Sequence, residues 1–158
     1  MSNPTDTTTR KASTEVVTHL NQIVAESYAL MAQLHLVHWN VEGENFFQLH
    51  EAYQAQYEEL FTAIDDLAER VRALGFHAEG GLSNLAARAS VEEGPSGVSF
   101  SGKDSVASAI VGHETVAAAC YEGRIKAAEA GDAETEDIMI ARIQVHQKAV
   151  WMLKSYLK

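Results

Sequence analysis

Four side chains in the first half of the chain are of the types that bind divalent metal ions: His38, His50, Asp65 and Glu69. Because residues four apart lie on the same side of a helix, the carboxylates of Asp65 and Glu69 can converge on one cation. Two imidazoles with two carboxylates suit Fe(II) and leave open positions for water or an oxidant. The same donors also fit Zn(II), so donor types alone do not decide between the two metals.

Each of these residues also has an ordinary structural interpretation. A lone histidine near an apolar seam is more often a hydrogen-bonded core residue than a metal ligand. A carboxylate pair such as Asp65 and Glu69 is more often part of a solvated helix face, here beside Arg70 or Arg72. The choice between the two interpretations therefore depends on spacing.

The spacing does not allow one chain to build the whole site. His50 lies roughly 22 Å along the helix axis from Asp65, at about 1.5 Å per residue. If two such helices pack antiparallel about a two-fold axis near residues 57–59, His50 of each copy meets Asp65 and Glu69 of the other. His38, at the end of the preceding helix, would enter from the same side as His50. The sequence therefore predicts two identical sites in a two-fold dimer.

The direction of the carboxylates agrees with a site between subunits. Asp65 directly follows Ile64, an apolar residue of the bundle seam. Successive helical residues are about 100° apart, so Asp65 points away from the bundle's own core. We expect it to face a neighbouring subunit.

Four long stretches of apolar residues at alternating spacings of four and three predict a helical bundle. Asn45 with Gln48 resembles a capping box at the start of the second helix, and Gly75 is well placed to end it. Ser101 with Asp104 is a cap for the third helix. Gly131 ends that helix, and Asp132 can cap the fourth. We expect helices over 16–37, 46–74, roughly 103–129 and roughly 133–157.

Residues 76–101 interrupt the periodicity with glycine and proline turns and contain one short helical stretch, 82–89. A connection of this length between two helices predicts a crossover along the bundle, as in ferritin-like folds. The predicted fold is all-α, a ferritin-like four-helix bundle with a long crossover between its second and third helices that carries a short helix. Residues 1–12 are expected to form a flexible tail, and 13–158 the bundle domain.

The charge balance favours a protein that handles cations over one that binds nucleic acid. The chain has 22 acidic and 12 basic residues, a formal net charge of −10. Non-specific DNA binding depends on Lys and Arg neutralising phosphates. The first residues offer only Arg10 and Lys11, opposed by Asp6. We expect weak or absent DNA binding.

The sequence also predicts a cytoplasmic location. The N-terminal residues are polar and Thr-rich, without the apolar core of a signal peptide. No stretch approaches about 18 apolar residues, so we expect no membrane contact. Cys120, the only cysteine, follows three alanines, and we expect a buried, inert thiol.

A longer pattern around the candidate ligands resembles the signature of the Dps proteins, the mini-ferritins also called DNA-binding proteins from starved cells. It reads His38-Trp39-Asn40-Val41-x-Gly43-x-x-Phe46/Phe47-x-x-His50, then Asp65-x-x-x-Glu69-Arg70. The similarity is close across the first two helices and looser across the last two, where Trp151 fits the pattern. The resemblance implies a dodecamer with ferroxidase sites at its two-fold interfaces. Two histidines of one subunit, His38 and His50, would bind iron with Asp65 and Glu69 of the neighbour.

The resemblance also implies roles for residues outside the ligand set. Trp39 would donate electrons that intercept oxidising radicals near the site, although ordinary packing is its alternative. Glu134 and Asp137 would line three-fold pores through which iron enters, although acidic residues at a helix start also complement the helix dipole. His35 is expected to support or border the site rather than to bind iron. The other histidines, which have no matching partners, are expected to be structural or surface residues: His19, His77, His113 and His146.

One departure from the pattern concerns a second iron ion. Many relatives have an aspartate four residues after the second histidine, and this chain has Gln54 there. A neutral amide attracts a second Fe(II) less strongly than a carboxylate does. We expect one tight iron position per site and a weaker or water-filled second one.

The leading hypothesis is an iron-storage and detoxification ferroxidase that protects against oxidative stress. The resemblance implies oxidation of Fe(II) preferentially by hydrogen peroxide and more slowly by dioxygen, with ferric mineral stored in the cage. The alternative is a DNA-compacting nucleoid protein with secondary iron binding. A di-iron enzyme built within one subunit needs Glu-x-x-His pairs, and none of the seven histidines has a glutamate three residues before it. A helical scaffold without metal is the remaining alternative.

Overall fold

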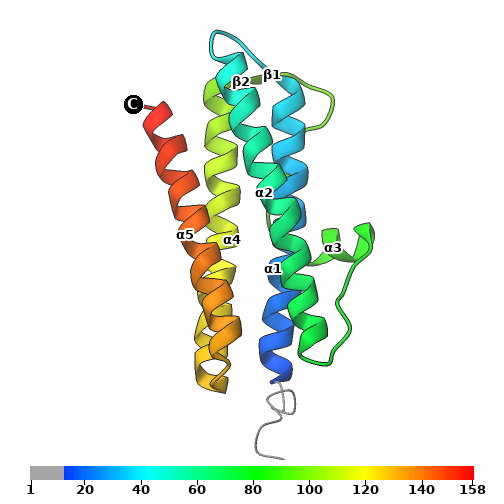
Figure 1. Ribbon diagram of the computed structural model, residues 1–158. Coiled ribbons are helices and arrows are strands. Elements are labelled where there is room, and N and C mark those ends of the chain that lie inside the picture. The colour runs from blue at the N-terminus through cyan, green and yellow to red at the C-terminus, as the bar shows by residue number, and fades with distance from the viewer. Residues whose placement is uncertain (1–12) are drawn as a thin grey trace, which may run out of the picture.

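The computed structural model describes residues 13–158, and four long helices form a bundle in it (Figure 1). The predicted flexible tail, including Arg10 and Lys11, lies outside the described residues. The long helices are α1 (Thr14–Asn40), α2 (Phe46–Ala73), α4 (Gly102–Ala130) and α5 (Ala133–Tyr156). The predicted all-α ferritin-like bundle is therefore confirmed, and α1 runs three residues beyond the end of its apolar seam at Val37.

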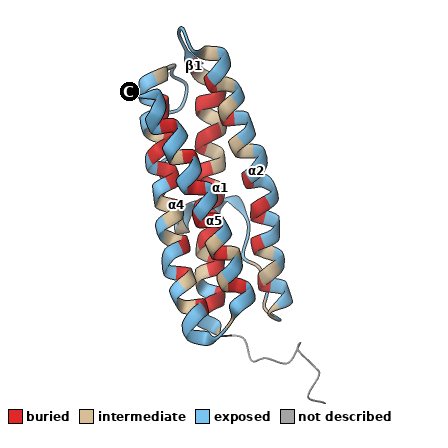
Figure 2. Ribbon diagram, turned by 60° about the vertical axis from the view of Figure 1, so that its left-hand side comes forward, coloured by how far each residue is buried: buried red, intermediate tan, exposed pale blue. Residues whose placement is uncertain are grey.

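The apolar seams predicted from the sequence are the core of the bundle. Leu20, Ile23, Leu30 and Leu34 of α1 have no exposed surface, and buried residues line the inward sides of the helices (Figure 2). A leucine or isoleucine moved fully from water into such a core contributes about 2 kcal/mol. The burial of these seams orients each helix, and with it the polar residues on its outer face.

The connection between α2 and α4 runs along the bundle, as the sequence predicts (Figure 1). It carries one short helix, α3 (Leu82–Arg88), and ends in a two-residue strand, β2 (Phe100–Ser101). This strand pairs in parallel with β1 (Val41–Glu42), which directly follows α1. The pairing fixes the end of α1 beside the start of α4, at the end of the bundle that holds His38.

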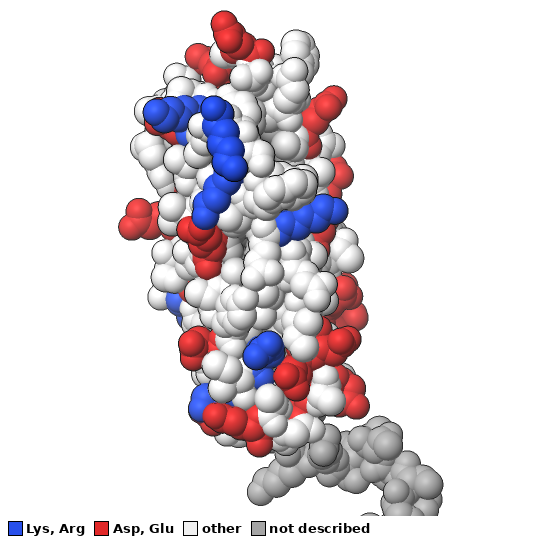
Figure 3. Space-filling view, turned by 90° about the vertical axis from the view of Figure 1, so that its left-hand side faces the viewer, with Lys and Arg blue, Asp and Glu red and all other residues white. Residues whose placement is uncertain are grey.

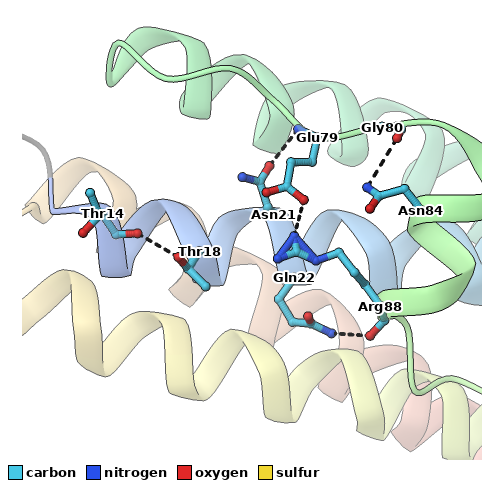
Figure 4. A network of polar contacts seen from close by, with 8 residues as sticks. All are labelled: Thr14, Thr18, Asn21, Gln22, Glu79, Gly80, Asn84 and Arg88. Carbon is cyan, nitrogen blue, oxygen red and sulfur yellow. Dashed lines mark hydrogen bonds and ion pairs between the residues drawn. The ribbon is translucent and has the colours of Figure 1, made fainter.

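Polar side chains of α1 hold the crossover in place. Asn21 accepts a hydrogen bond from the backbone of Glu79 (3.1 Å), and Gln22 donates one to the carbonyl of Arg88 (2.9 Å). Arg88 and Glu79 form an ion pair across the same loop (Figure 4). These contacts tie both sides of α3 to one helix face.

Glu26, on the next turn of α1, is a buried carboxylate that is fully satisfied. It accepts hydrogen bonds from the backbone of Ser90 (2.9 Å) and Val91 (3.1 Å) and from the Ser90 hydroxyl (2.7 Å). Burying a charge costs little only when hydrogen bonds replace its hydration. Glu26 therefore anchors the crossover where it leaves α3.

Most of the predicted helix ends are confirmed. Ser101 accepts a hydrogen bond from the Asp104 backbone, and Asp132 accepts one from the Thr135 backbone. Gly75 and Gly131 follow α2 and α4 with φ of +87° and +67°, a left-handed conformation that glycine adopts without strain. The predicted capping box at Asn45 is wrong. The Asn45 side chain makes no capping hydrogen bond, and its amide donates instead to the Tyr156 hydroxyl (3.2 Å).

Two further expectations concern single features. Cys120 has no exposed surface, and burial raises the pKa of its thiol to about 12, which keeps it protonated. Within residues 13–158, none of the helices combines the length and apolar character that crossing a membrane requires.

Candidate metal centre

The end of α1 and the first turns of α2 bring His38 and His50 into ring contact. Their centroids are 3.6 Å apart with the planes 17° from parallel. Nδ1 of His38 lies 2.8 Å from the backbone carbonyl oxygen of His50, and Nδ1 of His50 lies 2.9 Å from that of His38. Because a carbonyl only accepts, both Nδ1 atoms carry hydrogen. In the neutral imidazole this places the lone pair on Nε2, the form in which histidine binds a metal ion.

Aromatic side chains surround the two imidazoles. Tyr57 meets His38 edge-on at a centroid distance of 5.2 Å, and Phe46 lies 5.0 Å from His50. His35 lies 4.1 Å from Tyr57 and stacks on Trp39 at 5.2 Å. Burial, followed by the positive charge that His38 can carry, lowers the pKa of His35. His35 thus borders the histidine pair through Tyr57, as expected of a supporting residue.

Asp65 and Glu69 lie far from the histidine pair. Helix α2 is unbroken from Phe46 to Ala73, so the separation of roughly 22 Å along its axis holds. Among residues 13–158, no three His, Cys, Asp or Glu side chains gather closely enough to hold a metal ion. The structure therefore brings His38 and His50 together and does not bring the carboxylates to them. The premise that one chain cannot span the site is confirmed, and the shared site stays a prediction.

The two carboxylates are exposed and are not neutralised by the nearby arginines. Arg70 forms an ion pair with Asp132 (2.7 Å) and donates to the Thr135 hydroxyl. Arg72 donates to a backbone carbonyl and contacts a histidine ring. In the described part of the chain, neither arginine pairs with Asp65 or Glu69, so both carboxylates stand on a solvated helix face and stay available to a cation.

The remaining site residues lie on the exposed faces of α2 and α5. Gln54 is exposed, and its neutral side-chain amide donates a hydrogen bond to Glu58 (2.8 Å). Glu134 and Asp137 are exposed at the start of α5. Asp137 and Glu69 border one groove of about 900 Å³ between α2 and α5. Whether Glu134 and Asp137 line a pore depends on neighbouring subunits and stays a prediction.

A second histidine pair lies inside the bundle, in a polar chain that the sequence did not reveal. His113 and His146 are 2% and 0% exposed, and their Nδ1 atoms are 2.9 Å apart. Arg142 lies 3.2 Å from His146 Nε2 and forms an ion pair with Glu59. Gln56 Oε1 lies 3.1 Å from His113 Nε2. The expectation that His113 and His146 are structural holds, and both are core residues.

The donors and acceptors of this hydrogen-bond network can be assigned in only one way. Arg142 can only donate, so His146 Nε2 accepts and His146 carries its hydrogen on Nδ1. That hydrogen is donated to His113 Nδ1, so His113 carries its own on Nε2 and donates to Gln56. The lone pair of each ring thus accepts a hydrogen bond, and neither is free to bind a metal ion. Burial chiefly, with the charge of Arg142 adding, lowers the pKa of His113 to about 4 and that of His146 to about 2.

Residues 17–158 match the family model described as the ferritin-like domain. The chain is 36% identical over 139 residues to the DNA protection during starvation protein of Brevibacillus brevis, covering 88% of this chain and 92% of that one.

Two solved structures also match. Dps from Staphylococcus aureus superposes with a TM-score of 0.88 at 32% identity and covers 94% of this chain and 98% of its own. Dps from Vibrio cholerae O1, described as one of the ferritin-like diiron-carboxylate proteins, gives 0.87 at 28% identity, covering 96% and 92%.

Proposed function

Because the chain belongs to the Dps family of the ferritin-like superfamily, we propose that it is a ferroxidase that oxidises Fe(II) at sites shared between two subunits. The observation that carries this proposal is the reciprocal hydrogen bonding of His38 and His50. Each imidazole donates Nδ1–H to the other's backbone, and this leaves two preorganised nitrogen ligands at one end of the bundle.

The second subunit supplies the acidic half of the site. Packed antiparallel about an axis near residues 57–59, its Asp65 and Glu69 approach His38 and His50. Phe61, which is 71% exposed and lies between those residues and the axis along α2, would be removed from water by the same packing. The exposed, unpaired state of the two carboxylates in one chain fits this role.

The donor set accounts for the direction of the reaction. Two neutral imidazoles bind Fe(II), and two carboxylates favour the more highly charged Fe(III) product. Hydrogen peroxide is the proposed principal oxidant and dioxygen a slower one. Zn(II) fits the same donors and would compete with Fe(II) without being oxidised.

The ferric product is proposed to be stored as mineral inside a dodecameric cage in the cytoplasm. Glu134 and Asp137 would line the openings by which Fe(II) enters, since rings of carboxylates concentrate cations. Removing Fe(II) and peroxide together limits hydroxyl-radical formation, which would protect the cell against oxidative stress.

Adding Fe(II) and then hydrogen peroxide to the metal-free protein, while recording ferric absorbance, tests this function. Wild-type protein should oxidise Fe(II) much faster than buffer, and the His38→Ala/His50→Ala variant should lose that acceleration. The matched control is His77→Ala, which removes an exposed histidine in the loop after α2. Full activity in the double variant would remove the histidine pair from the mechanism.

DNA compaction is the less favoured second function. It is suggested by the name of the Brevibacillus brevis relative. The face in Figure 3 shows a small group of adjoining basic side chains near its upper end and others lying singly among acidic ones. Lys154 and Lys126 each form an ion pair with a glutamate. With a net charge of −10, we expect weak or absent binding in a gel shift at physiological salt.

A further inference from the structure

Gln54 stands one helical turn beyond the candidate ligand His50, and a hydrogen bond fixes the orientation of its side-chain amide. The nitrogen of the amide, Nε2, lies 2.8 Å from Oε1 of Glu58, one further turn along α2. A carboxylate only accepts hydrogen bonds, so the NH2 group of the amide must face Glu58. The carbonyl oxygen of Gln54 therefore points away from Glu58 and is the end of the amide that is left for a cation.

His50, Gln54 and Glu58 follow one another at intervals of four residues, so they lie along the same side of α2. His50 directs Nδ1 at a backbone carbonyl and keeps Nε2 for a metal ion. An amide oxygen is a neutral, hard ligand of the kind that divalent cations accept beside carboxylates. A second Fe(II), bound next to the one that His50 holds, would meet the carbonyl oxygen of Gln54.

Glu58 is not placed to bind the ion that His50 holds. It lies eight residues beyond His50, roughly 12 Å along the helix axis at about 1.5 Å per residue. Within residues 13–158, Glu58 forms no ion pair with a lysine or arginine. Its negative charge is therefore not neutralised by a neighbouring side chain and acts on the amide of Gln54.

We infer that Glu58 is a positioning residue for a second Fe(II), an inference that rests on the proposed function. By accepting a hydrogen bond from Gln54 Nε2, the carboxylate polarises the amide and increases the negative charge on Oε1. The amide oxygen becomes a stronger ligand, as an imidazole does when a carboxylate accepts from its other nitrogen. The carboxylate that this chain lacks at position 54 is thus supplied one turn later and acts through the amide.

The proposed packing of two subunits near residues 57–59 strengthens this contact. Gln54 and Glu58 are exposed in one chain, where water competes for their hydrogen bond. A hydrogen bond to a charged group becomes stronger where a neighbouring surface excludes water. The second Fe(II) position should therefore depend on Glu58 in the assembled protein.

Anaerobic calorimetric titration of the assembled, metal-free protein with Fe(II) tests the inference through a double-mutant cycle. Gln54→Ala and Glu58→Ala should each weaken the second Fe(II) position about tenfold and leave the first unchanged. The Gln54→Ala/Glu58→Ala variant should bind the second ion no more weakly than Gln54→Ala alone, because Glu58 acts through the amide.

The matched control is Glu51→Ala, which removes the same charge from an exposed position of α2, one residue after His50. Within the described residues, Glu51 shares no hydrogen bond with Gln54, whose amide donates to Glu58. Glu51→Ala should therefore weaken the second position less than Glu58→Ala does.

The outcomes separate the inference from the proposed function. An unchanged second position in Glu58→Ala would show that the hydrogen bond has no effect on binding. A further loss in the double variant, or an equal loss in Glu51→Ala, would show that Glu58 acts by its charge alone or binds iron itself. Wild-type protein that binds a single Fe(II) per site would leave no second ion for Gln54 to hold. Each of these results overturns the inference and leaves the ferroxidase standing, whereas wild-type protein that binds no Fe(II) contradicts both.

Discussion

Two histidine pairs in this bundle, with ring centroids 3.6 Å and 5.2 Å apart, have opposite chemistry. His38 and His50 direct Nδ1–H at backbone carbonyls and keep their Nε2 lone pairs. His113 and His146 bond to each other, and their Nε2 atoms are engaged by Gln56 and Arg142. The partner of each ring nitrogen, more than burial, determines whether a histidine is available to a metal.

The position of His38 in its helix contributes to this difference. His38 lies in the last turn of α1, where carbonyl groups lack partners from the next helical turn and can accept from a side chain. His113 and His146 lie within α4 and α5, where the backbone is already bonded. Their ring nitrogens therefore bond to other side chains, drawn from three helices.

The largest effect on stability is expected from the inner pair. His146→Ala removes a fully buried ring and, with it, one hydrogen-bonding partner each of Arg142 and His113, which should cost about 3 kcal/mol. His50→Ala, which removes the partly buried member of the outer pair, should cost about 1 kcal/mol. Urea unfolding measures both variants. Equal costs would show that the inner pair has no special structural role.

An effect of comparable size per histidine, confined to a defined pH range, follows from the lowered pKa values of His113 and His146. Unfolded histidines take up protons below about pH 6.5, whereas the folded pair resists protonation until about pH 4 or lower. The contribution of the two neutral rings to the free energy of unfolding should therefore be fully present above about pH 6.5. It should be lost as the pH drops toward 4, by roughly 2–3 kcal/mol per histidine.

The control for this pH dependence is His113→Gln/His146→Gln. This variant removes the two titrating histidines and keeps Arg142 and Glu59, the charged pair of the same hydrogen-bond network. Its unfolding free energy should vary less between pH 6.5 and 4.5 than that of wild-type protein, as followed by urea titration at each pH. A slope equal to that of wild-type protein would contradict the assignment of neutral rings.

The smallest expected effect concerns the second iron position of the outer pair. Gln54→Asp replaces a neutral amide with a carboxylate and should tighten the weaker Fe(II) position about tenfold, or about 1.4 kcal/mol. Anaerobic calorimetric titration with Fe(II) measures it. Gln48→Asp, a change of the same charge at an exposed position of α2, is the control and should leave the second position unchanged.

The fold could be predicted from the sequence because periodicity and caps are local signals. Each of these signals is formed by residues of a single helix: the apolar seams, the glycine after α2 and the Ser101 cap of α4. The outer ligand pair could be proposed for a similar reason, since a fixed motif surrounds it. Asn45 misled because its side chain bonds to the far end of the chain, at Tyr156.

The hydrogen-bond network of the inner histidine pair could not be predicted, because its contacts depend on how three helices pack together. Arg142 and His146 are one turn apart, which the sequence shows, but Gln56 and His113 become neighbours only in the bundle. The same holds for Glu26, whose partners lie in the crossover. Donor and acceptor roles then follow from the whole network and not from any one residue.

The sharing of the site between two chains is tested most directly by mixing two inactive variants. One carries His38→Ala/His50→Ala, and the other Asp65→Asn/Glu69→Gln. In a mixed dimer, one of the two sites combines intact histidines with intact carboxylates. Co-assembly of equal amounts should therefore restore about a quarter of wild-type Fe(II) oxidation, since about half of random pairs are mixed. No recovery in a mixture shown to contain mixed dimers would contradict the shared site.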